Sequence, residues 1–325
     1  MTTMISQSEI YAWTRCRRNW YLTYYLGFVP ADEAPTGARQ LGTRVHTALE
    51  AYYGYQLDPL AVLALLYKIE ANRTPEFASD LATEADMADA MVSGYLEWLA
   101  TEGVDADFRT VATETDVRVD LPGVPGVQLR ARMDQVSERI SDGALLFRDY
   151  KTGSNFEVAE QLRMNPQMRF YTLVQHLASP PDGPKIAGGT IDTLRRVKRT
   201  ARANPPYYRR DPFLYTPEEV HATLLKVQTV ASQIMAARAL LDDAYQRSGG
   251  DLAVIDQVQR SQMYPTQIPN DCKWWCTFRE ICPMMDDGSD WSASLVRSGR
   301  FRQADPYEYY RDDALRTIRE EMAKV

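Results

Sequence analysis

The fold that the sequence predicts depends most on one stretch, Leu145-Leu146-Phe147-Arg148-Asp149-Tyr150-Lys151-Thr152-Gly153. It opens with apolar residues on both faces of a strand, which is typical of a strand buried within a sheet. Because side chains at i and i+2 share a face, Asp149 and Lys151 point the same way at the exit of this strand. A carboxylate and an ammonium near a buried strand end must be paired or coordinate a metal. A plain surface ion pair between them is the alternative interpretation of this segment alone.

Further strands are expected on either side of this segment. Residues 109–120 and 127–138 alternate and are rich in β-branched side chains, and Pro-Gly and Asp-Gly turn signals separate the strands. The second of them contains Arg132-Met133-Asp134, which supplies a carboxylate from a neighbouring strand. Together, Asp134 and Asp149 are suited to hold a divalent cation, while Lys151 orients the attacking water or stabilises charge on a phosphate. Another strand is expected at about 186–194.

Helices are expected before, between and after these strands. Ser6 and Glu9 form a capping box that opens the first helix, and the last helix of the N-terminal third opens at Thr83. The expected helical ranges are 6–27, 41–53, 59–103, 165–177, 216–246 and an amphipathic helix from about residue 306. This order predicts an α/β fold with a central mixed sheet flanked by helices, extended by helical N-terminal and C-terminal additions.

We expect residues 1–325 to form a single domain with three consecutive parts. Residues 1–108 form a helical N-terminal part with Cys16 and His46, residues 109–200 form the sheet core, and residues 201–325 form a helical C-terminal part with the other three cysteines. A chain of 325 residues is long enough to bury a large core.

Composition and charge exclude some classes of protein. No apolar run reaches the roughly 18 residues of a membrane span, and the N-terminus lacks the pattern of a secretory signal, so we expect a cytoplasmic protein with no membrane partner. The net charge of −7 argues against a passive nucleic-acid coat. It does not argue against an enzyme that acts on DNA, because only the surface facing the phosphates needs positive potential.

Three local clusters of basic residues could supply that potential or could be solvated faces. Arg15, Arg17 and Arg18 form the first, Arg39 and Arg44 the second, and Arg195, Arg196, Lys198, Arg199 and Arg202, followed by Tyr207, Tyr208, Arg209 and Arg210, the third. Charge combined with aromatic side chains suits the binding of a single strand by phosphate contacts and base stacking. We therefore expect the following residues to contact nucleic acid: Arg44, and from the third cluster Arg195, Arg196, Lys198, Arg199, Tyr207 and Tyr208.

Two helices carry further candidate residues. His46 lies beside the apolar stripe of the second helix, with Glu50 one turn later on the same face. A histidine in such a place is commonly a structural residue, so this position alone leaves its role open. Gln167 and Tyr171 share one face of the helix that begins near residue 165.

Taken in order, these motifs resemble those of the PD-(D/E)XK nucleases, and of their RecB-like branch with the AddB and Cas4-family exonucleases in particular. The resemblance runs from about Ser6 to Pro283 and rests on Gly42-Thr43-Arg44-Val45-His46, Asp134, Asp149-Tyr150-Lys151-Thr152-Gly153 and Gln167-x-x-x-Tyr171. It implies a restriction-endonuclease-like core. It also implies that His46, Asp134 and Asp149 bind the metal, that Lys151 is catalytic, and that Gln167 and Tyr171 lie beside the site.

The resemblance implies a role for one further acidic residue, and the sequence departs from the family pattern at one motif. Glu114 resembles the extra acidic residue of many members, although Asp116 and Glu138 are nearby competitors. Many relatives carry Gly-x-x-Asp or Pro-Asp before the first acid, and here the tetrapeptide is Ala131-Arg132-Met133-Asp134. The acid itself is present, so we expect altered packing with the chemistry retained.

The implied activity is hydrolysis of DNA phosphodiester bonds with Mg²⁺ or Mn²⁺, on single strands or ends, as an exonuclease. An imidazole ligand favours Mn²⁺ more than Mg²⁺. The sequence has no P-loop, so unwinding would require a helicase or recombination partner. Two alternatives stay open. One is a DNA-binding accessory subunit with a vestigial nuclease site, and the other is a zinc-stapled binding protein without catalysis.

The four cysteines are Cys16 and the run Cys272-x₃-Cys276-x₅-Cys282. In a cytosolic protein such a set is more typical of a metal site than of two disulfides. RecB-like nucleases with a cluster show the same split of one cysteine before and three after the nuclease motifs, and the resemblance implies a [4Fe–4S] cluster. Their tail spacing is C-x₂-C-x₅-C, so the extra residue here keeps a zinc site open. Four unligated thiols are the other alternative.

A staple is the expected role of this cluster. Closing the loop between residues 16 and 272 would remove about 5 kcal/mol of unfolded-state freedom on the chain-entropy model. That value is comparable to the net stability of a whole domain. Four apolar residues are expected to shield the cluster from water: Trp274, Trp275, Phe278 and Ile281.

Overall fold

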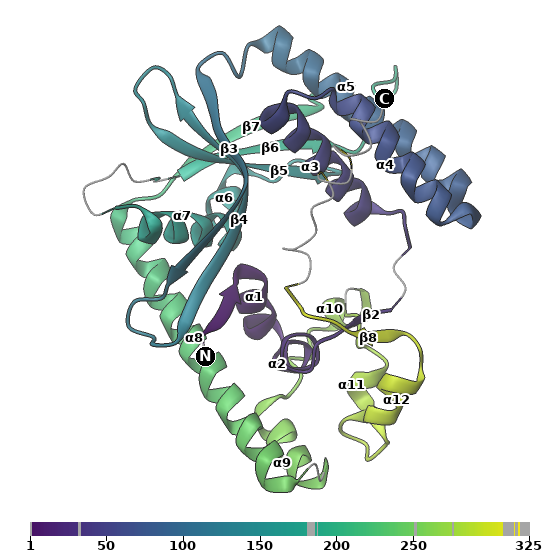
Figure 1. Ribbon diagram of the computed structural model, residues 1–325, viewed down its shortest axis with the longest axis vertical. Coiled ribbons are helices and arrows are strands. Elements are labelled where there is room, and N and C mark those ends of the chain that lie inside the picture. Colours follow the sequence, from purple (N-terminus) through teal and green to yellow (C-terminus); the bar gives the residue numbers. More distant parts are fainter. Residues whose placement is uncertain are drawn as a thin grey trace. The chain divides into compact units, whose positions relative to one another are not determined.

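The computed structural model describes residues 2–31, 34–180, 186, 188–249, 252–274, 276–307, 315 and 318 (Figure 1). The chain forms two compact units that are interleaved in sequence. The first comprises Met1–Glu33, Asp120–Arg130 and Leu224–Asp312, and the second comprises Ala34–Val119, Ala131–Thr223 and Asp313–Val325. The three consecutive parts expected from the sequence therefore do not coincide with these units.

A six-stranded mixed sheet runs in the order β1-β4-β5-β6-β7, with β3 also paired to β4. The strands are β1 (Thr3–Ser6), β3 (Phe108–Asp120), β4 (Val127–Arg139), β5 (Leu145–Gly153), β6 (Gly188–Arg195) and β7 (Tyr208–Leu214). Pairing is parallel between β1 and β4 and between β5 and β6, and antiparallel between β4 and β5 and between β6 and β7. The predicted α/β fold with a mixed sheet flanked by helices is confirmed.

Helices of the second unit lie on both sides of its part of the sheet (Figure 1). They are α3 (Ala38–Tyr55), α4 (Pro59–Arg73), α5 (Ala78–Glu102), α6 (Ala159–Arg163) and α7 (Pro166–Ala178), with a short 3₁₀ turn at Pro75–Phe77. Tyr150 of β5 stacks on Tyr53 of α3, with ring centroids 6.1 Å apart. Phe147 points to the opposite face and packs edge-on against Tyr171 of α7, with ring centroids 6.0 Å apart. The apolar beginning of β5 is thus buried on both sides, as its sequence indicates.

The first unit is mainly helical. It contains α1 (Gln7–Arg15), α2 (Arg17–Trp20), a π-helical turn (Tyr21–Tyr25), most of α8 (Pro217–Ser248), α9 (Leu252–Gln262), α10 (Pro269–Trp274), α11 (Ile281–Met284) and α12 (Trp291–Arg297). A two-stranded sheet pairs β2 (Phe28–Pro30) with β8 (Phe301–Gln303). The fully buried Glu9 accepts hydrogen bonds from Trp20 Nε1 at 2.9 Å and from Arg238 of α8 at 2.8 Å. This carboxylate therefore joins α1, α2 and α8.

Several expected elements differ in the structure. Ser6 caps α1 as predicted, but the helix is interrupted at Cys16, whose φ of −159° and ψ of 111° are extended. The helix expected from Thr83 begins at Ala78. The strand Tyr208–Leu214 was not expected, because Pro212 and three charged residues weaken its strand pattern. The helix expected from about residue 306 lies almost wholly outside the described residues.

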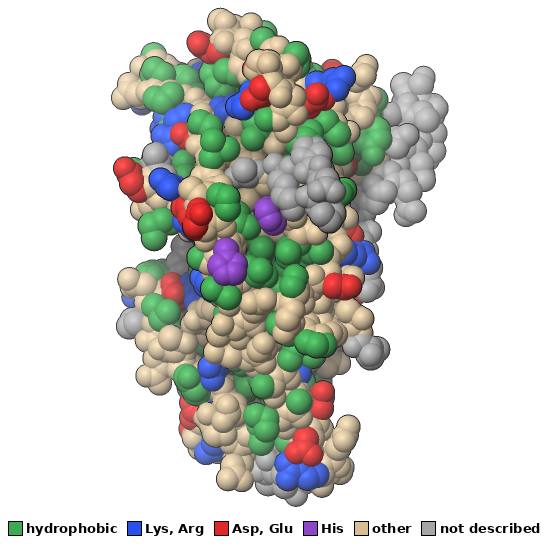
Figure 2. Space-filling view, turned by 90° about the vertical axis from the view of Figure 1, so that its left-hand side faces the viewer, with side chains coloured by type: hydrophobic (Ala, Val, Ile, Leu, Met, Phe, Trp, Pro, Cys, Tyr) green, Lys and Arg blue, Asp and Glu red, His purple; other side chains and the backbone are tan. Residues whose placement is uncertain are grey.

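On one face of the molecule, charged side chains lie in small mixed groups (Figure 2). On the face shown in Figure 2, acidic and basic residues stand beside one another, and the residues drawn in colour form no continuous basic area. Within the described part of the chain, no helix has the length and apolar character needed to cross a membrane.

Candidate active site

Asp149 and Lys151 lie on one face of β5, as their spacing predicts. The Asp149 side chain is buried, and its Oδ2 lies 2.7 Å from Lys151 Nζ. Residues 147–153 pair in parallel with residues 189–195 of β6, so the backbone carrying both side chains is held along its whole length. The carboxylate and the ammonium are thus fixed next to each other on a central strand.

Asp134 lies on β4, where the antiparallel pairing with β5 ends. The pairs run from Glu138 with Leu145 to Gln135 with Arg148. Beyond them, the backbone N–H of Tyr150 donates to Asp134 Oδ2 at 2.8 Å. The same oxygen lies 3.3 Å from Nδ1 of His46, which α3 supplies. Asp134 therefore connects the sheet to α3.

A chain of polar contacts continues from Lys151 to α7. Lys151 Nζ donates to Gln167 Oε1 at 2.9 Å, and Gln167 Nε2 donates to the Tyr171 hydroxyl at 2.8 Å. Asn165 caps α7, because its side chain accepts from the backbone N–H of Gln167 at 2.9 Å. The structure thus brings Gln167 and Tyr171 beside the catalytic candidates.

Glu114 of β3 joins this group, and its two competitors form ion pairs of their own. Glu114 forms an ion pair with Arg132, and its φ of 46° is unusual for a residue other than glycine. Asp116 pairs with Arg118, and Glu138 pairs with Arg109. The pKa of Glu114 responds to the charges of Asp134 and His46, so Glu114 lies in the same electrostatic group.

The electrostatics of the site follow from burial and from pairing. Burial raises the pKa of Glu114 to about 7, and the negative charge of Asp134 adds to this effect. Burial also raises the pKa of Asp149, with Lys151 opposing the shift. Burial disfavours the charged form of His46, but the carboxylate of Asp134 outweighs it and raises the pKa of His46 to about 9. At neutral pH, therefore, His46 is protonated, and His46 and Lys151 place positive charge beside Asp134 and Asp149.

The donors of this group fit a divalent cation. Carboxylates and an imidazole are ordinary ligands of Mg²⁺ and Mn²⁺. Across the part of the chain that the structure describes, no three His, Cys, Asp or Glu side chains form a ready-made site for one metal ion. In this arrangement the positive charges of His46 and Lys151 lie against the carboxylates that a cation would need.

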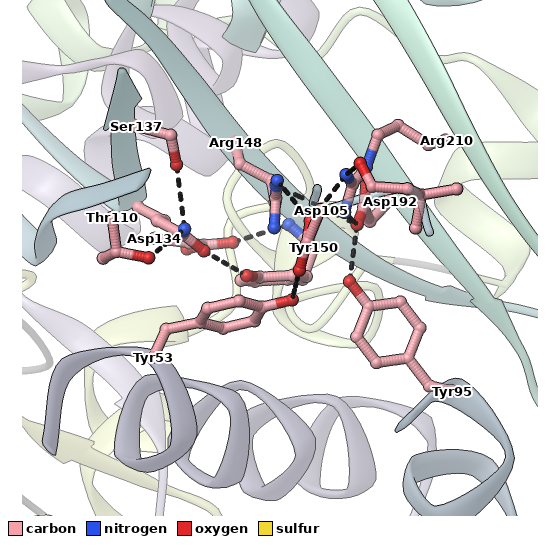
Figure 3. A network of polar contacts seen from close by, with 12 residues as sticks. Tyr53, Tyr95, Asp105, Thr110, Asp134, Ser137, Arg148, Tyr150, Asp192 and Arg210 are labelled. Atoms are coloured by element: carbon pink, nitrogen blue, oxygen red, sulfur yellow. Dashed lines mark hydrogen bonds and ion pairs between the residues drawn. The ribbon is translucent and has the colours of Figure 1, made fainter. Parts of the chain in front are cut away.

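A second polar network supports the site from the other face of β5 (Figure 3). The Tyr150 hydroxyl bonds to Gln135, whose Nε2 donates to Thr110 at 2.9 Å and to Ser137 at 2.8 Å. The buried Arg148 donates to Asp105 at 2.9 Å. Four more residues belong to this network: Tyr53 of α3, Tyr95 of α5, Asp192 of β6 and Arg210 of β7.

These supporting residues were not predicted from the sequence. Arg132 is two residues before Asp134 on the same strand face, a spacing that would have indicated a partner for an acid at the site. Arg148 and Tyr150 alternate with the catalytic candidates, which places them on the opposite face. Their partners Asp105 and Gln135 belong to other segments, so the sequence pattern alone does not reveal them.

The basic residues expected to contact nucleic acid differ in their surroundings. Arg44 is buried and donates to Glu84 at 2.7 Å and to the carbonyl of Pro35 at 2.8 Å. Tyr208 is also buried and packs on Tyr95. Both lack the exposure that a nucleic-acid contact needs.

The third basic cluster keeps some exposed charge. Lys198 pairs with Asp86, and Arg199 pairs with Glu97 at 2.7 Å. Arg195 donates to the carbonyls of Asn204 and Pro206, Arg196 donates to the hydroxyl of Ser154, and the Tyr207 hydroxyl donates to the carbonyl of Ala203. Arg195 and Arg196 therefore bond to neutral oxygens, in contrast to Lys198 and Arg199.

The first unit brings the four cysteines to one cavity. Cys16, Cys272, Cys276 and Cys282 line a cavity of about 810 Å³, and all four are half-buried and free of disulfides. Burial raises the pKa values of the Cys276 and Cys282 thiols. The charge of Cys16 adds to both shifts, and Arg18 opposes the shift of Cys282. Phe278 and Ile281 are buried as expected, whereas Trp274 is 66% exposed and Trp275 lies outside the described residues.

Comparisons with known proteins identify the family of this chain. A search of curated proteins found none that matches it. Among solved structures, the chain is similar to a "Putative exonuclease" from Eubacterium rectale, at 11% identity and a TM-score of 0.46, with 84% of this chain and 88% of that chain covered. The family model described as "PD-(D/E)XK nuclease superfamily" matches residues 4–283. That range covers most of the chain and includes every residue of the candidate active site. The chain therefore belongs to the PD-(D/E)XK nuclease superfamily.

Proposed function

We propose that this protein is a metal-dependent deoxyribonuclease that removes nucleotides from single-stranded DNA or from DNA ends. One observation carries the proposal: Asp134, Asp149 and Lys151 converge at the point where β4 and β5 separate, with His46 bound to Asp134. A buried acidic pair with a fixed ammonium suits phosphodiester hydrolysis. A partner that unwinds or recombines DNA would supply its substrate.

The side chains of this chain divide the chemical work. Asp134, Asp149, Glu114 and His46 would hold a divalent cation, which when bound supplies Lewis acidity and activates water. Lys151 is held between Asp149 and Gln167, so its ammonium stands ready to orient water or to stabilise charge on the phosphate. Gln167 and Tyr171 limit the rotation of Lys151, which keeps its donors aimed in one direction.

The ligand set also indicates a metal preference. Mg²⁺ favours oxygen ligands and retained waters, whereas Mn²⁺ accepts an imidazole more readily. We expect Mn²⁺ to support activity at least as well as Mg²⁺. Titrations at equal concentrations that give activity with Mg²⁺ alone would contradict this expectation.

We propose that the four cysteines hold a [4Fe–4S] cluster. They line one cavity together, and none of them is in a disulfide. An iron–sulfur protein is brown and a zinc protein is colourless, so absorbance together with iron, sulfide and zinc analysis separates the two.

We propose that Arg195 and Arg196 contact the phosphates of the substrate. They bond to neutral oxygens, whereas Lys198 and Arg199 are paired with carboxylates. Removal of one phosphate-binding cation should reduce the salt dependence of DNA binding by about one unit of log–log slope. We expect Arg196→Gln to do so, and the matched change Lys198→Gln to have the smaller effect. Equal effects of the two variants would contradict this assignment.

The first experiment is digestion of end-labelled single-stranded DNA with Mn²⁺, using wild-type protein and Asp149→Ala, both purified without oxygen. Degradation by the wild type alone supports the nuclease, and the ladder of products gives its polarity. Asp142→Ala is the control, because this acid is exposed and is paired with Arg139. A folded, brown wild-type protein that leaves the DNA intact would instead favour the DNA-binding accessory subunit.

A further inference from the structure

Arg18 belongs to the first basic cluster of the sequence, but its side chain is buried inside the first unit. Its side chain is 3% exposed, although it carries a charge. It lines the same cavity as the four cysteines. A buried guanidinium needs hydrogen-bond acceptors for its N–H groups. The residues that supply these acceptors indicate the role of the buried charge.

The acceptors of Arg18 all lie in the C-terminal segment of the first unit. Nη1 donates to the carbonyl of Cys282 at 2.8 Å and lies 3.5 Å from Cys282 Sγ. The two terminal nitrogens bind the carboxylate of Asp286 in a fork, each at 2.8 Å. Nε donates to the carbonyl of Met263 at 3.2 Å. Arg18 thus fixes both the backbone and the sulfur of one cysteine.

The positions of these residues in the sequence match this geometry. Arg18 follows Cys16 by two residues, and Asp286 follows Cys282 by four. The ion pair between Arg18 and Asp286 therefore closes the same long loop that a cluster on Cys16 and Cys282 would close. This closure does not depend on a bound cluster.

We propose that Arg18 is a positioning residue for the cluster, which holds Cys282 in place and sets the reduction potential through its bond to the sulfur. This inference rests on the proposed [4Fe–4S] cluster. Reduction adds negative charge to the cluster, so a cation and an N–H donor at a ligand sulfur favour the reduced state. Net charge and hydrogen bonds to the sulfurs are the main determinants of such potentials.

Substitutions at the two residues of this ion pair should shift the reduction potential in opposite directions. Arg18→Met removes the cation and the donor, so the reduction potential should fall. Asp286→Asn removes the negative charge that balances Arg18, so the potential should rise. Loss of a residue that orients a metal ligand commonly weakens metal retention about tenfold or more. We therefore expect Arg18→Met to lose its cluster to a chelator about tenfold faster than the wild type.

The experiment is a potentiometric titration of the full-length protein, purified without oxygen, followed by absorbance and electron paramagnetic resonance. Iron and sulfide content and the rate of bleaching by an iron chelator are measured on the same samples. Arg17→Met is the matched control, because it removes an adjacent cation that stacks on Trp13 and Tyr264. This control should keep the wild-type potential and bleaching rate.

Opposite shifts in Arg18→Met and Asp286→Asn support the inference, and a purely structural role for Arg18 predicts no such opposition. Should Arg18→Met fail to fold, Asp286→Asn decides the question by an upward shift or its absence. A wild-type protein with a cluster, combined with unchanged potentials in the variants, overturns this inference and leaves the proposed function standing. Zinc in place of iron in the wild type overturns the inference and the proposed cluster together. Neither outcome affects the digestion test with Asp149→Ala.

Discussion

The candidate active site and the cysteine cavity are both suited to metals, but they differ in what balances their ligands. In the active site, Asp134 is bound by His46 and Asp149 by Lys151, at 3.3 and 2.7 Å. In the cysteine cavity, burial raises the pKa values of the Cys276 and Cys282 thiols, which favours neutral sulfur without a metal. In the first group each aspartate has a counter-charge from the chain, whereas in the second Arg18 contacts the sulfur of Cys282 and its own charge is balanced by Asp286.

This difference indicates that a metal at the first group would serve function and that a metal at the second would serve stability. The active site is held by β5, β6 and α7 without a cation, so a bound metal would serve the reaction. The cysteines come from residue 16 and from residues 272–282, and a bound cluster would join these distant segments. Metal loss should therefore cost activity at the first group and folding free energy at the second.

The largest expected effect is on stability, in Cys16→Ser. Removing this ligand should abolish the cluster and lower the free energy of unfolding by about 5 kcal/mol, because the loop to residue 272 is no longer closed. Denaturant unfolding of samples purified without oxygen measures the change. The ion pair between Arg18 and Asp286 closes nearly the same loop, so the loss would be reduced if that pair survives.

Asp149→Asn is the matched change in the other group. It removes one active-site charge but no link between distant segments, so the free energy of unfolding should change far less than in Cys16→Ser. Comparable losses in the two variants would show that both groups serve stability alike.

The next largest effect is on catalysis, in Lys151→Met. The change removes the ammonium that contacts Asp149 and Gln167, and hydrolysis should slow by about 10²- to 10³-fold. Single-turnover rates on labelled DNA measure the effect. Lys198→Met is the control, because Lys198 is paired with Asp86 on the surface. A Lys151 variant that retains more than about a tenth of the wild-type rate would remove this lysine from the catalytic group.

Much of the active site could be predicted because its residues follow local rules. Period-two spacing places Asp149 and Lys151 on one face, and the pair Asn165-Pro166 fixes the start of the helix that carries Gln167. These features depend on neighbouring residues in the chain. The strand and the cap were therefore correct within a few residues.

What could not be predicted depends on partners distant in the sequence. Arg18, Arg44 and Arg148 are all buried, and their acidic partners lie 268, 40 and 43 residues away. A basic residue in a polar stretch normally indicates an exposed face, since burying its charge requires a partner. The break at Cys16 is likewise invisible in a strong helical pattern, and only the folded chain reveals it.

A third prediction concerns pH and tests whether protons and a metal ion compete for the same side chains of the active site. His46 must lose its proton to bind a cation, and its pKa is raised to about 9. Because protons compete with the metal, the apparent affinity for Mn²⁺ should rise about tenfold per pH unit between pH 7 and 9. Below about pH 7, Glu114 is also protonated, so the dependence should become steeper. Isothermal titration at several pH values measures this slope. In His46→Gln the slope above pH 7 should disappear, and a slope equal to that of the wild type would contradict the assignment of His46 as a ligand.

The smallest expected effect tests whether the network behind β5 belongs to stability or to catalysis. Tyr150 contributes to the active site through its backbone N–H, which donates to Asp134, and to the network through its hydroxyl, which bonds to Gln135. Tyr150→Phe keeps the first contact and removes the second. It should lower the free energy of unfolding by about 1 kcal/mol, with hydrolysis close to the wild-type rate. A large loss of activity at unchanged stability would mean that the hydroxyl controls the position of Asp134, and the two faces of this strand would then form one functional unit.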